Sequence, residues 1–285
     1  MLVDRLPPRL DYRARQLAID FTWIPYHGEP ARDAAEIRRG EAKSGTSHFH
    51  CYASAYLIYQ NKRVTLAVTM VRADDSTLAV LQRLLDRVQT LGIRCSRLYL
   101  DRSFCNVQVI RFLQSQPFVS ILPVIRRGRS LKVLLKVNQS YQTQHTITNP
   151  KCGSVTFPLW VVCRYLKWRR GKKGIERLAY AVIGQLPWNP MQVRDGYRRR
   201  FGIEASYRLM NRVRARTTSA EPNRRFLYVA IALLLVNVWA YLKWAYLRLG
   251  KRVYHRLFPL SKMMRFLNQA IEQACGLQVS VSLQL

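Results

Sequence analysis

The sequence predicts an α/β fold in which a mixed sheet is flanked by helices. Three consecutive runs rich in β-branched and aromatic residues, at 17–24, 49–60 and 63–71, have the composition of strands. Beyond them, segments with apolar residues at helical spacing alternate with further short strand-like runs. Three strands followed by alternating helices and strands are typical of a mixed α/β sheet. Hydrophobic residues make up 49% of the 285 positions, which is enough to form the buried core of such a fold.

The elements after the third strand each have a signal of their own. Asp75 and Ser76 have the composition of a helix start, and leucine and valine then recur at helical spacing until Gly92. The elements predicted next are a strand at 97–100 that ends on Asp101, a helix at 107–113 and a strand at 118–125.

The pattern changes between Arg126 and Pro190. Strand-like runs at 159–168 and 178–183 are separated there by Gly, Lys and Arg, so we predict a β-rich insertion at 126–190, before the last helices of the core. The remaining predicted parts are a short N-terminal tail at 1–15, the two halves of the core at 16–125 and 191–249, and a helical C-terminal tail at 250–285.

A long apolar helix is predicted in the second half of the core. Residues 226–247 are almost continuously apolar, a capping box at 218–221 opens the helix, and Gly250 closes it. Such a helix can be the centre of a protein core or can span a bilayer. Because Asn237 and Lys243 interrupt the apolar run, we predict a core helix, and a membrane-associated basic protein is the alternative.

The charge predicts the kind of partner. Lys and Arg number 47 against 16 Asp and Glu, which gives a net charge of +31 and indicates a polyanion such as nucleic acid. The six cysteines include no C-x-x-C pair, so a zinc ribbon or a disulfide framework is not indicated. Residues 1–10 lack the apolar run of a signal peptide. We therefore expect a cytoplasmic protein that associates with the nucleoid when it binds DNA.

Because acids are scarce, the positions of three carboxylates are informative. Asp20 is the first charge after the short apolar run 17–19, and Asp101 is the first charge after the strand-like run 98–100. Glu204 lies within a block of arginines, and a helical period of 3.6 places it on one face with Tyr197, Arg200 and Asn211. Three converging carboxylates repel one another unless cations lie between them, and such hard oxygen ligands favour Mg²⁺ or Mn²⁺. Two such ions can activate the attacking oxygen and stabilise the leaving oxygen when a phosphodiester is cut.

These motifs resemble a known family, the DDE transposases of bacterial and archaeal insertion sequences. Tyr197, Arg200 and Glu204 match the first three positions of the signature Y-x2-R-x3-E-x6-K of one subgroup, and segments 18–22 and 99–104 are similar to its two Asp regions. The resemblance covers roughly residues 16–249. It implies an RNase H-like catalytic core, with double-stranded DNA as partner and a homodimer in the synaptic complex.

The resemblance also implies roles for individual residues. Asp20, Asp101 and Glu204 become a catalytic triad that binds two Mg²⁺ or Mn²⁺ ions. Four further residues become DNA-phosphate ligands: Tyr197, Arg200, Arg208 and Arg212. The implied activity is cleavage of a DNA strand at a transposon end, followed by attack of the freed 3′-hydroxyl on target DNA. In the insertion, Trp168 and Trp188 are the candidates for stacking on a displaced base, although core packing is the preferred role for both.

The sequence departs from the family pattern in three places. Asn211 occupies the signature lysine position, with Arg212 beside it, and Ser103 stands where the family often has glycine. Fewer than 20 residues precede Asp20, whereas full-length members usually carry a separate N-terminal DNA-binding domain. These departures keep an alternative open, in which the chain is an inactive or truncated transposase remnant that binds DNA without cutting it.

Overall fold

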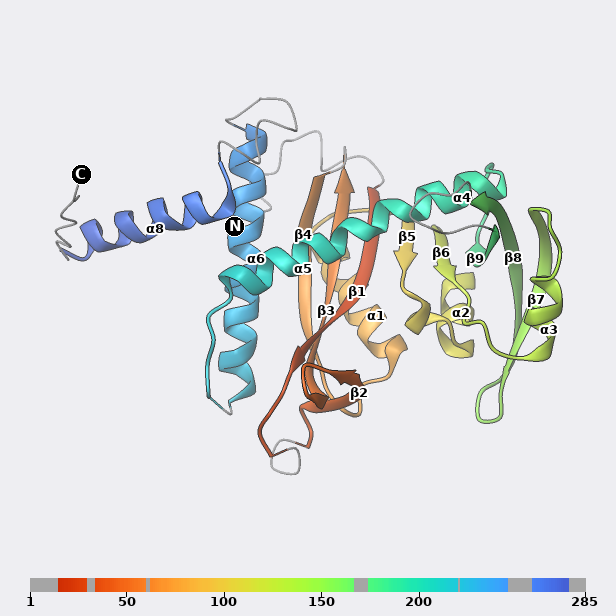
Figure 1. Ribbon diagram of the computed structural model, residues 1–285, viewed down its shortest axis with the longest axis horizontal. Helices are drawn as coiled ribbons and strands as arrows, with labels where there is room; N and C mark the ends of the chain where they lie inside the picture. The colour runs from red at the N-terminus through yellow and green to blue at the C-terminus, as the bar shows by residue number, and fades with distance from the viewer. Residues whose placement is uncertain are drawn as a thin grey trace. The chain divides into compact units, whose positions relative to one another are not determined.

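The computed structural model describes residues 15–29, 34–59, 62–166, 174–219, 221–245 and 258–276. It contains one nine-stranded mixed sheet in the order β2-β3-β1-β5-β6-β9-β8-β7, with β4 beside β3 (Figure 1). The strands are β1 (Arg15–Pro25), β2 (Ile37–Lys43), β3 (Thr46–Tyr59), β4 (Lys62–Val71), β5 (Cys95–Leu100), β6 (Val119–Pro123), β7 (Tyr141–Asn149), β8 (Gly153–Leu166) and β9 (Gly174–Ile183).

The centre of the sheet is parallel and its flanks are antiparallel. β1 pairs in parallel with β5, and β5 with β6, while β3 and β4 extend the sheet antiparallel on the side of β1. Ile19 pairs with Leu100 in the last pair of the β1–β5 ladder, so the next residues, Asp20 within β1 and Asp101 just after β5, are neighbours. Both strands are buried through Leu17, Leu98 and other apolar side chains, which fixes this register.

Helices α1 (Thr77–Thr90) and α2 (Val107–Gln114) pack against the sheet and against each other. The predicted start of the first helix is confirmed, because the Ser76 hydroxyl accepts the backbone N–H of Ala79. Asn106 caps α2 in the same way through the N–H of Val109. Both helices bury one apolar face, which is what their helical spacing predicted.

The five strands predicted in the first half of the core are all present, but β2 was missed. Its sequence, Ile37 to Lys43, is mostly charged and lacks an alternating apolar pattern. Most of its side chains are exposed, and its hydrogen bonds with β3 hold it in place instead of burial. An edge ribbon of this kind gives almost no hydrophobic signal in the sequence.

The insertion is rich in strands, as predicted, and it belongs to the same sheet. β9 pairs antiparallel with β6, and β8 and β7 follow outward. The short helix α3 (Arg129–Leu134), which was not predicted, precedes these strands. The structure thus extends the core sheet through the insertion.

The chain divides into two compact units, residues 1–204 and 205–285. The second contains helices α6 (Pro222–Ala245) and α8 (Leu260–Ala274), which pack around Val236, Trp239 and Met263. The Trp239 indole N–H donates to the Phe258 carbonyl at 3.0 Å. α6 begins close to the predicted capping box, whereas Gly250 lies outside the described residues.

Within the described residues, α6 is the one helix long and apolar enough to cross a membrane, over Pro222–Lys243. The core helices of soluble proteins meet the same criterion of length and composition. Part of α6 is buried in the second unit through Val229, Leu233 and Val236. The predicted role as a core helix therefore has a structural counterpart in this part of α6.

Candidate active site

Two aspartates converge on one arginine at the centre of the sheet. The Arg200 Nη2 atom lies 2.7 Å from an oxygen of Asp20 and 3.5 Å from an oxygen of Asp101. The backbone N–H of Phe21 also donates to Asp20, and the Ser103 hydroxyl donates to Asp101. The strand register explains why these two carboxylates meet. Ile19 and Leu100 are the last residues that pair between β1 and β5, and each aspartate is the next residue in its chain segment.

Burial shapes the protonation of Asp20. The pKa of this carboxyl is raised to about 6: burial raises it most, Arg200 and the Phe21 N–H lower it, and the nearby Asp101 adds to the rise. The ionised form of Asp20 is thus disfavoured even though the positive charge of Arg200 lies beside it, and a further positive charge would stabilise it. Close to neutral pH, Asp20 is therefore an anion that a further cation stabilises.

Arg200 is almost fully buried, at 5% exposure. Burial alone lowers the pKa of its guanidinium, but Asp20, Tyr197 and Asp101 outweigh this effect and raise the pKa. The Arg200 Nε is buried and has no hydrogen-bond acceptor among the described residues. Of the five N–H donors of the side chain, some are therefore unused in the structure.

Tyr197 is a core residue, at 3% exposure. Its hydroxyl donates to the Leu100 carbonyl at 3.1 Å, and its ring packs near Tyr180 and Phe201. Burial raises its pKa. The predicted contact of Tyr197 with a DNA phosphate stays a prediction, and it requires the buried hydroxyl to leave the Leu100 carbonyl. In the structure, Tyr197 ties the segment that carries Arg200 to the end of β5, next to Asp101.

The predicted single helical face is wrong. Helix α4 (Pro190–Tyr197) ends in a 3₁₀ turn, η5 (Arg198–Phe201), and helix α5 (Gly202–Val213) begins only after it. A 3₁₀ turn has about 3.0 residues per turn instead of 3.6, so it changes the phase between the two helices. Tyr197 and Arg200 are consequently buried, whereas Glu204 and Asn211 are exposed.

Glu204 is exposed to solvent, whereas Asp20 is buried and Asp101 is half-buried. It lies in the first turn of α5, and the described residues contain no group of three or more Asp, Glu, His or Cys side chains that could hold a metal ion. Asp20 and Asp101 do fit a divalent cation, because their oxygens already share one cationic nitrogen. The three-carboxylate triad remains a prediction, of which the structure assembles two members.

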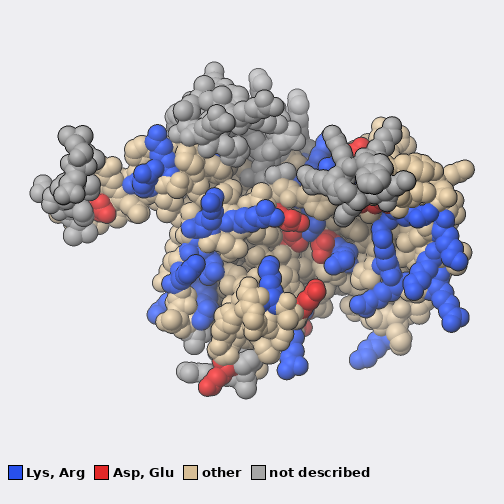
Figure 2. All heavy atoms as spheres, viewed as in Figure 1, with Lys and Arg blue, Asp and Glu red and all other residues tan. Residues whose placement is uncertain are grey.

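The segments on either side of Glu204 carry exposed arginines. Arg198 and Arg199 in η5, and Arg208 and Arg212 in α5, are exposed, as the predicted phosphate contacts of the last two require. Lys and Arg side chains are spread over the described part of the face in Figure 2, with a few acidic side chains among them. A further basic run between β6 and β7 was not singled out from the sequence. Its exposed members are Arg126, Arg127, Arg129, Lys132 and Lys136.

Trp188 has a packing role. Its ring lies 4.0 Å from the guanidinium carbon of Arg97, and a Cβ added to Gly196 would come within 2.4 Å of it. Gly196 is therefore the residue in α4 that leaves room for this ring. The preferred interpretation of Trp188 as a packing residue is consistent with these contacts, and Trp168 lies outside the described residues.

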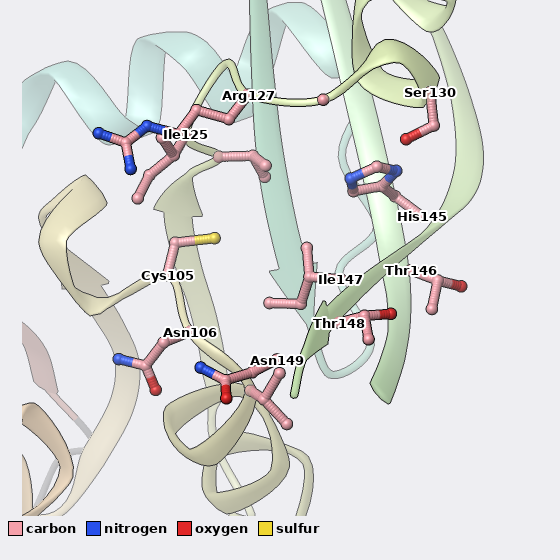
Figure 3. Close-up of a pocket in the computed structure, with 13 residues that line it drawn as sticks. Cys105, Asn106, Ile125, Arg127, Ser130, His145, Thr146, Ile147, Thr148 and Asn149 are labelled. Atoms are coloured by element: carbon pink, nitrogen blue, oxygen red, sulfur yellow. The ribbon is translucent and has the colours of Figure 1, made fainter. Parts of the chain in front are cut away.

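A pocket of about 580 Å³ lies beside the segment that follows Asp101. Cys105 and Ile125 line one side of it, and His145 and Ile147 of β7 face them (Figure 3). Burial lowers the pKa of His145, so its imidazole is neutral at pH 7. No pattern in the sequence predicts this pocket, because its walls come from three segments that are distant in the chain.

Comparisons with known proteins bear on the fold. No family model matches the sequence, and no curated protein matches it. Among solved structures, the chain is similar to a piggyBac transposase in a synaptic complex with hairpin DNA, with a TM-score of 0.53 and 12% identity. The match covers 94% of this chain and 55% of that one, so the chain spans about half the length of its neighbour.

A second similar structure is the NurA nuclease from Sulfolobus solfataricus, at 12% identity over 62% of this chain and 70% of that one. Its TM-score of 0.30 is too low to support an argument. The piggyBac likeness, at 12% identity, supports the fold alone. The chain has a mixed α/β fold, a large mixed sheet flanked by helices, and this fold is consistent with the predicted RNase H-like class.

Proposed function

We propose that the chain is a DDE-type transposase of the insertion-sequence kind, which cuts a DNA strand at a transposon end and transfers the freed 3′-hydroxyl to target DNA. The observation that carries the proposal is the convergence of Asp20 and Asp101, from adjacent parallel strands, on one cationic nitrogen. Two buried or half-buried carboxylates held together in a chain of net charge +31 are suited to chemistry on a polyanion.

Asp20 and Asp101 would hold the divalent cations of this reaction, with Glu204 as the third ligand. Mg²⁺ or Mn²⁺ bound there supplies an activated oxygen nucleophile and stabilises the oxygen that leaves phosphorus. The protein itself keeps both aspartates in place through the strand register and through Ser103 and the Phe21 N–H. Its part in the reaction is to position the carboxylates at one end of the β1–β5 pair.

Double-stranded DNA is the proposed partner, and two copies of the chain would hold two transposon ends. Exposed arginines of η5 and α5 supply phosphate contacts that do not depend on base sequence. The same charge favours a cytoplasmic protein bound to the nucleoid.

The test is nicking of a supercoiled plasmid with Mg²⁺ or Mn²⁺ supplied or chelated. The wild-type chain is expected to cut only with the metal, and Asp101→Asn and Glu204→Gln are expected not to cut. Asp86→Asn is the matched control, because it removes one exposed carboxylate on α1, away from the site. Cutting that continues in chelator, or in Asp101→Asn, would contradict the proposal.

The exposed position of Glu204 favours a second candidate, a transposase remnant that binds DNA without cutting it. In that case all four proteins bind the plasmid with a strong dependence on salt, and none of them nicks it with either metal. The same experiment therefore separates the two candidates.

A further inference from the structure

We infer that Arg200 is an internal cation that takes the place of the metal in the DNA-free protein, and that DNA draws it away so that the metal can enter. This inference rests on the proposed function, because it assigns Asp20 and Asp101 to a divalent cation. It gives Arg200 the role of a positioning residue, which acts through the two carboxylates.

Two acidic side chains share one cationic nitrogen. Asp20 and Asp101 lie next to the last pair of the β1–β5 ladder, and the Arg200 Nη2 atom lies within 3.5 Å of an oxygen of each. Without a cation there, the two carboxylates would repel each other in a largely buried site. Arg200 therefore holds them in the arrangement that a metal ion also requires, but it occupies the same oxygens.

The Arg200 guanidinium has hydrogen-bond donors that the two aspartates leave unused. Its Nε is buried without an acceptor in the described structure, and its ion pairs with Asp20 and Asp101 both use Nη2. A DNA phosphate offers several acceptor oxygens, and arginine binds phosphate through paired N–H groups. Binding a phosphate would therefore satisfy donors that the two aspartates leave unused.

The site can also open. The side chain of Asp101 is 34% exposed, so an ion can reach the pair from solvent. Arg200 lies in η5, a 3₁₀ turn between two helices, and such turns inside a helix often mark hinges. Tyr197, bound to the Leu100 carbonyl, fixes the start of this turn while the rest of it is free of that bond.

The consequence is a coupling between two ligands. If DNA removes Arg200 from the carboxylates, DNA strengthens metal binding, and by reciprocity the metal strengthens DNA binding by the same factor. The DNA-free protein is kept from holding a reactive metal, because Arg200 competes for the same oxygens.

The experiment measures Mn²⁺ affinity from the electron paramagnetic resonance signal of the free ion, with and without a DNA duplex and without any readout of cutting. The wild type is expected to bind Mn²⁺ weakly alone and roughly tenfold more tightly with DNA. Arg200→Met is expected to bind tightly without DNA and to gain little from it. Arg200→Lys, which restores a positive charge, is expected to return the affinity toward the wild-type value. Arg198→Met is the matched control, an exposed arginine in the same turn, and should keep the wild-type affinity for Mn²⁺ without DNA.

Arg200→Gln serves as a second variant if Arg200→Met does not fold, since its amide can still donate to a carboxylate without carrying charge. Equal Mn²⁺ affinity in wild type and the neutral variants, or no binding by any of them, would overturn the inference. Failure of the proposed function looks different. In that case Arg200→Met gains Mn²⁺ affinity as expected, yet the wild type never nicks DNA.

Discussion

The two strand-borne aspartates and the helix-borne glutamate are placed by different means. Asp20 and Asp101 follow paired residues of β1 and β5, so hydrogen bonds and burial on both strands fix where they lie. Glu204 lies in the first turn of α5, after the 3₁₀ turn η5, and is exposed. Carboxylates on strands of one sheet are pre-organised, whereas a carboxylate after an irregular turn depends on the phase of that turn.

This difference implies that the sheet and the segment 197–204 have separate roles in the site. The sheet holds the two proposed metal ligands in place in the free protein, and the segment from Tyr197 to Glu204 carries the residues that we propose to move. Arg200 and Glu204 are four residues apart, so a movement of η5 that removes the arginine also alters the position of the glutamate. Substitutions in the sheet and in the segment 197–204 should therefore differ in their effects on nicking, stability and DNA binding.

The largest effect is expected from Asp101→Asn. Loss of a metal ligand on a strand should lower metal-dependent nicking on the order of 10³-fold or more. The same measurement on Glu204→Gln sharpens the comparison. An equal loss places Glu204 in the active site when DNA is bound, and nicking close to wild type would contradict its role as the third ligand.

A smaller effect is expected from the pH dependence of Asp20 in the absence of metal. Its pKa is about 6 in the folded protein, against 3.8 in an unfolded chain. The folded state therefore binds more protons between these values, and its free energy of unfolding falls as the pH rises from about 4 to about 6. The loss relative to Asp20→Asn should be on the order of 3 kcal/mol.

Urea unfolding at several pH values between 4 and 7 measures this difference. Asp86→Asn, a change to an exposed aspartate of α1, should behave as the wild type does. Parallel pH profiles for wild type and Asp20→Asn would show that Asp20 is not strained by burial.

The next effect is expected from Tyr197→Phe. Loss of the hydroxyl leaves the buried Leu100 carbonyl without its donor and should lower the free energy of unfolding by about 1–2 kcal/mol. Chemical denaturation measures this change. Tyr165→Phe is the control, because Tyr165 is exposed. A Tyr197→Phe protein as stable as wild type, but with weaker DNA binding, would support the predicted phosphate contact.

The smallest effect is expected from Arg208→Ala on α5. If Arg208 contacts a phosphate, its loss should weaken DNA binding uniformly across sequences and reduce the slope of log affinity against log salt by about 1. Asn211→Ala, an uncharged exposed change on the same helix, should leave the slope unaltered. An unchanged slope for Arg208→Ala would place that face of α5 away from DNA.

The sequence predicted the elements that bury apolar faces and the residues that those elements position. Ser76, Asp20 and Asp101 were found because a helix cap and a first charge after an apolar run are local signals in the chain. β2 was missed because an exposed ribbon has no apolar period, and the helical face of Tyr197 and Glu204 was wrong because nothing local marks η5 as a 3₁₀ turn. The pairing of Arg200 with both aspartates depends on tertiary contacts between residues about 100 to 180 positions apart, which no local pattern encodes.

Exchange of Arg200 for a divalent metal at Asp20 and Asp101 would be visible in a structure of the chain with Mn²⁺ and a DNA duplex, in which anomalous scattering locates the metal. We expect Mn²⁺ between Asp20 and Asp101, Glu204 turned toward it, and the Arg200 guanidinium on a DNA phosphate. Arg200 still bound to both aspartates in the DNA complex, with no Mn²⁺ beside them, would show that the exchange does not take place.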